Sequence, residues 1–87
     1  MVLVTPQLDG SNYHSWSRSM KRVLSKNKFK FVNGDILEPT RDDGKYEAWE
    51  RCNVMVVSWI TRTLITQIAQ STVYIDNAKE LWEDLKE

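Results

Sequence analysis

Few side chains in this chain are able to do catalytic or metal chemistry. Its 87 residues include one histidine, His14, and one cysteine, Cys52, and a Cys/His catalytic site or a zinc site needs more members. We expect His14 to face solvent near the start of a helix and Cys52 to line the core. Asp42 and Asp43 are adjacent, but no further carboxylate or glycine pattern completes a calcium loop. The sequence therefore predicts no catalytic residue and no metal site.

The spacing of the glycines argues against nucleotide chemistry as well. Gly10, Gly34 and Gly44 lie too far apart to form a P-loop or a dinucleotide-binding turn. We therefore expect no cofactor, no small-molecule substrate and no enzymatic activity.

Cations and aromatic rings alternate in residues 26–31. In one interpretation Lys26, Lys28 and Lys30 contact phosphates while the two Phe rings stack on bases. In the other, Phe29 and Phe31 face the core and the lysines point to water. We favour the second because the whole domain is neutral and lacks the basic excess of a dedicated nucleic-acid binder. At most, weak and sequence-indifferent RNA binding is expected.

Charge is distributed unevenly along the chain although its net value is zero. Residues 13–32 contain six basic side chains and no acidic one, whereas residues 33–87 contain eleven acidic side chains and six basic ones. Such polarity allows a basic face of one copy to contact an acidic face of another. Exposed aromatic side chains near the end of the chain would add apolar area. The candidate self-association residues are Arg18, Lys21, Arg22, Glu80, Glu83, Asp84, Trp82 and Tyr74.

Apolar side chains recur at helical spacing in four segments, at about 12–26, 45–63, 66–73 and 77–87. Ser11 or Asn12 is expected to cap the first helix and Thr66 the third. The last helix is expected to begin at Asp76 or Asn77, with Glu80 completing a near capping box. In the second helix, Met55 and Val57 widen the apolar stripe, which predicts contacts on more than one side.

A turn is expected between the first two helices. Residues 29–37 alternate in polarity around Asn33 and Gly34, which predicts a tight hairpin or a looser turn. Trp16, Trp49 and Trp59 are expected to pack between the first and second helices. The fold class predicted is all-α, a compact bundle of about four helices forming one domain over residues 1–87.

The chain also carries signals about its compartment. No apolar run approaches the roughly 20 residues that cross a membrane, and the first residues lack the pattern of a signal peptide. The single Cys52 cannot form an internal disulfide. We expect an intracellular, cytoplasmic protein that does not bind membranes.

Four motifs follow one another along the chain. After the leader Leu3-Val4-Thr5-Pro6 they read Leu8-x-Gly10-x-Asn12-Tyr13-x-x-Trp16, Phe31-Val32-x-Gly34, Tyr46-x-x-Trp49-x-x-x-Asn53-x-x-Val56-x-x-Trp59-Ile60, and Ile75-x-x-Ala78-x-x-Leu81-Trp82-x-x-Leu85. Their order and spacing resemble the N-terminal region of the Gag polyprotein of copia-type LTR retrotransposons, particularly plant elements. The resemblance implies an all-helical domain, related to capsid N-terminal lobes, that helps to build the particle packaging the element's RNA. The further capsid helices and the zinc knuckle of a complete Gag are not in this sequence.

Two functions are compatible with these features. The first is a structural module that associates with copies of itself, weakly when isolated. The alternative is a module that binds RNA or another protein through residues 26–31 or an exposed aromatic patch.

Overall fold

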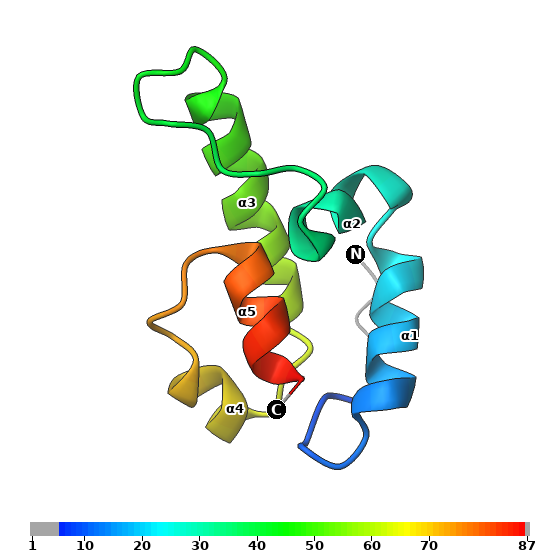
Figure 1. Cartoon of the computed structure of the whole chain (residues 1–87). Coiled ribbons are helices and arrows are strands. Elements are labelled where there is room, and N and C mark those ends of the chain that lie inside the picture. The colour runs from blue at the N-terminus through cyan, green and yellow to red at the C-terminus, as the bar shows by residue number, and fades with distance from the viewer. Residues whose placement is uncertain (1–5, 87) are drawn as a thin grey trace.

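The computed structural model describes residues 6–86 as five helices, with a long loop, residues 34–45, between the second and the third (Figure 1). The helices are α1 (Tyr13–Val23), α2 (Lys26–Asn33), α3 (Tyr46–Thr61), α4 (Thr66–Ser71) and α5 (Ala78–Leu85). Within residues 6–86 no strand forms, and one isolated β-bridge joins Leu8 to Leu64. The predicted all-α class is therefore confirmed. The leader residues 3–5, and Glu87 at the expected end of the last helix, lie outside the described residues.

Helix α2 replaces the hairpin that was one of the two expectations for residues 29–37. Phe29 and Phe31 lie on either side of the buried Val32 in a helix. The turn itself is present, because Gly34 ends α2 in the left-handed region with φ of 92°. An Asn-Gly pair is found both at helix C-termini and in hairpin turns, because both structures need a residue at positive φ. The bundle thus has five helices where four were expected.

Helix α5 packs against α2 and α3, and its Trp82 contacts aromatic rings of α1 and α2. The ring of Trp82 stacks on that of Trp16 in α1, with centroids 5.3 Å apart. The ring of Phe29 in α2 meets it edge-on, at 5.7 Å. Trp82 is therefore only 4% exposed. The helical spacing predicts Trp82 in the core, with exposure near the end of the chain as the alternative. Its burial agrees with the core position and leaves little of the ring for a contact, because α1 and α2 both place aromatic rings against it.

The other two indoles contribute less to the core than expected. Trp49 and Trp59, both on α3, are half-buried, whereas Trp16 is 1% exposed. Trp59 packs against the edge of the core beside α2, where the Lys28 ammonium lies 5.4 Å from its ring centroid. Of the three tryptophans predicted to pack between the first and second helices, Trp16 alone is thus fully buried.

The residues before α1 fasten the N-terminal segment to the junction between α3 and α4. Leu8 is buried, and its backbone N–H donates to the Thr63 carbonyl at 2.8 Å while its carbonyl accepts from Ile65 at 3.1 Å. Gly10 adopts φ of 95°, which a residue with a Cβ rarely does. The Asn12 side chain closes the turn by accepting from the Asp9 N–H at 3.0 Å and donating to the Gln7 carbonyl at 2.9 Å. Leu8, Gly10 and Asn12 of the first motif therefore form the turn that attaches the N-terminal segment to the rest of the domain.

Asn53 fixes the start of α5 against α3. Its side chain is buried, donates to the Asp76 carbonyl at 2.6 Å and accepts from the Ala78 N–H at 2.8 Å. Asn77 then caps α5 by accepting from the Glu80 N–H at 3.1 Å, so the predicted cap is confirmed. These hydrogen bonds fix the start of α5 relative to α3. Leu81 of α5 is buried in the core.

Other helix ends differ from expectation. Helix α1 ends at Val23 and not at residue 26, because Leu24 turns to an extended conformation. Helix α3 is two residues shorter at its C-terminal end than the 45–63 expected. Thr66 is the first residue of α4 and makes no capping hydrogen bond, and the cap position is held by Ile65. Asn12 is at the cap position of α1, but its side chain bonds outside the helix.

Candidate functional site

The basic side chains of α1 lie together on its solvent-facing side. Arg18, Lys21 and Arg22 are exposed, while Trp16 and Met20 of the same helix are buried. The Lys21 ammonium lies 5.7 Å from the Phe29 ring centroid, so it is partly held against α2. Within residues 6–86 the only ion pair joins Lys79 to Glu83, and therefore these three cations have no internal anionic partner.

The three lysines of α2 do not form one strip. Successive residues of an α-helix are about 100° apart, so Lys26 and Lys30 share a face while Lys28 points elsewhere. Lys28 lies over Trp59 of α3, whereas Lys26 is exposed. Phe29 and Phe31 both pack against the core, as the second interpretation expects, but they do so from a helix. The alternation expected for residues 26–31 is replaced by a helical period, and Lys28 therefore lies over Trp59.

Acidic side chains occupy the outer side of α5. Glu80, Glu83 and Asp84 are exposed, and Glu83 is already paired with Lys79 at 3.0 Å. Two carboxylates of the predicted set, those of Glu80 and Asp84, thus have no cation within the described chain. The tertiary structure keeps these acids and the basic side chains of α1 on different helices, as the polarity of the sequence indicated.

The connection between α4 and α5 presents apolar side chains to solvent. Tyr74 is 73% exposed and its neighbour Val73 is 81% exposed. The prediction that Tyr74 is available at the surface agrees with its position. Three further apolar side chains are exposed although the sequence pattern did not predict it, namely Leu37, Val54 and Met55. Met55 widens the apolar stripe of α3 in the sequence, but no element covers it.

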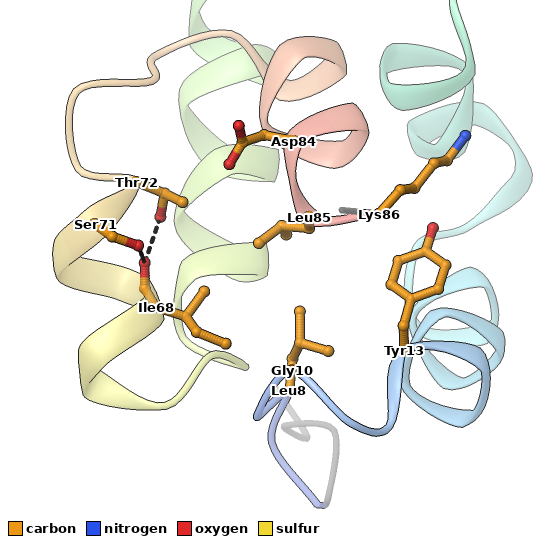
Figure 2. A pocket seen from close by; sticks show the side chains of 9 residues that line it. All are labelled: Leu8, Gly10, Tyr13, Ile68, Ser71, Thr72, Asp84, Leu85 and Lys86. Carbon is orange, nitrogen blue, oxygen red and sulfur yellow. Dashed lines mark hydrogen bonds between the residues drawn. The ribbon is translucent and has the colours of Figure 1, made fainter.

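A cleft opens where the N-terminal turn meets α4 and the end of α5 (Figure 2). It has a volume of about 230 Å³, and Leu8, Ile68 and Leu85 give it an apolar floor. The hydroxyls of Ser71 and Thr72 both donate to the Ile68 carbonyl at 2.9 Å, so their protons are engaged within α4. Ligand sites are usually larger, about 300 to 1,000 Å³, with several convergent polar groups. The cleft lacks the features of a small-molecule site.

A second hollow lies beside the N-terminal half of α3. Its wall includes Trp49, whose indole Nε1 is buried and has no hydrogen-bond partner within residues 6–86. Donors and acceptors are mixed around it, with Arg41 on one side and Glu50 and Asp76 on others. The Tyr46 hydroxyl lies 3.3 Å from a Glu50 carboxylate oxygen. Three acidic residues, Glu38, Glu50 and Asp76, line the hollow with one basic residue, Arg41, so its lining is mainly acidic.

The side chains with catalytic or ligating potential are dispersed. His14 is exposed on the first turn of α1, and Cys52 is half-buried on α3. Asp42 and Asp43 are exposed in the loop before α3. Among residues 6–86 no group of three or more His, Cys, Asp and Glu side chains is placed to hold a metal ion. No helix in the same part of the chain is long and apolar enough to cross a membrane.

Comparison with known proteins supports the resemblance seen in the sequence. A family model described as the Gag-polypeptide of LTR copia-type matches residues 1–40. Searches of curated proteins and of solved structures gave no significant match. The predicted resemblance to copia-type Gag is therefore confirmed over residues 1–40, while the motifs at residues 46–60 and 75–85 lie outside the match. The likeness to a capsid N-terminal lobe stays a prediction. The matched region covers the N-terminal turn, α1 and α2, and hence all the basic candidate residues from Arg18 to Lys30.

Proposed function

We propose that this chain is a non-enzymatic structural module of a copia-type Gag, which associates with copies of itself in a capsid-like or virus-like particle in the cytoplasm. The match of residues 1–40 to copia-type Gag supports the Gag-like structural role. The separation of charge between α1 and α5 supports self-association. Arg18, Lys21 and Arg22 lie on one helix, and the exposed acids lie on another.

The proposed contact is head to tail. A basic α1 face meeting an acidic α5 face is heterologous, so it generates rings or open chains, as a particle-forming subunit requires. Each exposed ion pair contributes only about 0 to 1 kcal/mol, so charge sets the orientation and apolar contacts must supply affinity. The exposed Tyr74 is available for such a contact. Association of the isolated domain should therefore be weak.

Sedimentation over a concentration series, at low and high salt, tests this proposal. Triple reversal of Arg18, Lys21 and Arg22 to Glu should abolish the charge-dependent association. A matching reversal of Glu80 and Asp84 to Lys, mixed with the first variant, should restore it. Glu83 is left intact because it pairs with Lys79 within the chain. A parent protein that stays monomeric at millimolar concentration and low salt would remove the proposal.

RNA binding is the second candidate function, and the basic side chains of α1 and α2 support it. Exposed cations extend from Arg18 on α1 to Lys26 on α2 without an intervening acid. Binding through such a patch should be weak, indifferent to sequence and strongly reduced by salt. Replacing Lys26 and Lys30 with Ala should weaken it more than replacing Lys28, because Lys28 lies over Trp59. Tight binding that persists at high salt would favour the RNA-binding function over the structural one.

A further inference from the structure

Helix α3 has one face that no other element of the described chain covers. Asn53, Val56 and Ile60 form its buried face. The residues on the opposite side fall within about 120° of arc at 100° per residue. All are exposed except the half-buried Ser58. This open face of α3 consists of Glu47, Ala48, Arg51, Val54, Met55, Ser58 and Arg62.

The middle of the open face is apolar. Val54 is 59% exposed and Met55 is 41% exposed, and they occupy adjacent positions halfway along α3. A surface helix ordinarily carries polar side chains on the side facing solvent. Two adjacent aliphatic side chains there, with a small Ala48 one turn and a half away, leave room for close approach of another helix.

Opposite charges mark the two ends of the same face. Glu47 lies in the first turn of α3, and Arg62 is the residue that ends the helix. Their positions are about 22 Å apart along the axis, at 1.5 Å per residue. Neither takes part in the single ion pair of the described chain, Lys79 with Glu83. Arg51 lies one turn after Glu47 on the same face, so the face carries Glu47 and Arg51 toward one end, apolar side chains in the middle and Arg62 at the other end.

We propose that the open face of α3 packs antiparallel against the same face of a second copy of this chain. A two-fold axis beside Val54 and Met55 places Val54 against Met55 of the partner subunit. The same register places Glu47 opposite Arg62 of the partner subunit, and two-fold symmetry makes each pairing occur twice. An antiparallel arrangement brings unlike ends together, whereas a parallel one would place Glu47 beside Glu47 of the partner subunit. Charge therefore selects the antiparallel register.

This contact is distinct from the head-to-tail contact of the proposed function, although it rests on the same capacity for self-association. None of its residues belongs to α1 or α5, so one molecule is able to use both surfaces at once. A two-fold contact combined with a head-to-tail contact would link chains laterally. A single helix pair buries less than the roughly 1,200 Å² of a standard stable interface, so the dimer should be weak.

Sedimentation equilibrium of the 87-residue chain, with charge exchange between positions 47 and 62, tests the register. Glu47→Arg and Arg62→Glu should each weaken the dimer at least tenfold, because each places two pairs of like charges across the axis. The double variant E47R/R62E should return to within about threefold of the parent, since all four charges are exchanged together. A double variant as weak as the singles would overturn the proposal.

An apolar probe with a matched control completes the test. Met55→Glu should weaken the dimer at least tenfold, whereas Val73→Glu, at a more exposed apolar position outside α3, should leave it unchanged. Circular dichroism checks that each variant keeps its helices. If reversal of Arg18, Lys21 and Arg22 abolishes all association and α3 variants change nothing, the α3 contact is wrong and the head-to-tail contact stands. If the reverse is seen, the head-to-tail contact is wrong.

Discussion

The indole N–H of Trp16 donates a hydrogen bond to the hydroxyl of Thr63 at 2.9 Å, across 47 positions of sequence. Both side chains are buried, and the Thr63 hydroxyl in turn donates to the Ile60 carbonyl at 2.6 Å. The bond ties the first turn of α1 to the segment just after α3. It lies next to the place where Leu8 pairs with the backbone of residues 63 and 65. The N-terminal turn, α1 and α3 are thus fixed at one point.

Replacing Thr63 with Val should lower the free energy of unfolding by about 1 to 3 kcal/mol. The change keeps the shape of the side chain but leaves the Trp16 N–H buried without an acceptor. Thr63→Ser keeps the hydroxyl and should cost less. Thr66→Val, at an exposed position, is the matched control. Urea unfolding followed by tryptophan fluorescence measures the differences, and equal stability of the Val and Ser variants would contradict the role of this bond.

Asn53→Ala should destabilise the protein by about 1 to 3 kcal/mol, because the Asp76 carbonyl and the Ala78 N–H both lose a buried partner. Hydrogen exchange should show faster exchange at the start of α5 than in α1. Asn27→Ala, on the exposed side of α2, serves as the control and should change stability little. Uniform loss of protection in every helix, without a larger effect in α5, would contradict a local role.

Trp82→Ala should cost about 3 to 5 kcal/mol, since it removes the ring on which Trp16 and Phe29 pack. Trp59→Ala should cost less, because Trp59 is half-buried at the edge of the core. Thermal melting of both variants checks this order. A Trp59 variant that melts below the Trp82 variant would show that the core is centred on α3 and not on α5.

Asp9 should make stability depend on pH in the acid range. The backbone N–H and the hydroxyl of Ser11 donate to its carboxylate, which holds the pKa of Asp9 below its ordinary value of 3.8. A lowered pKa in the folded state means that this contribution is present above pH 3.8 and is lost as pH falls through the folded pKa. Asp9→Asn should flatten the acid limb of the stability profile. Equal acid dependence in Asp9→Asn and parent would contradict the assignment, and Asp35→Asn provides the comparison at another exposed loop acid.

Local signals predicted the features whose causes lie within one or two turns of chain. The side chain of Asn77 caps α5 because the acceptor and the Glu80 N–H are three residues apart. The apolar spacing of Tyr13, Trp16 and Met20 specified α1 for the same reason. The exposed positions of Arg18 and Glu80 likewise followed from the polar sides of their helices. The candidate charges could be predicted, but their exposure says nothing by itself about a partner.

The sequence by itself determined the helical class, the cap of α5 and the separation of charge, because periodicity, capping and charge are local properties. Only the tertiary structure decided which aromatic ring lies innermost and which residues face solvent. Phe29 and Phe31 fit a strand of period two as well as two sides of a helix, and packing of Phe29 on Trp82 is what favours the helix. Met55 is apolar in the sequence yet open to solvent, because burial depends on whether another element reaches that side of α3.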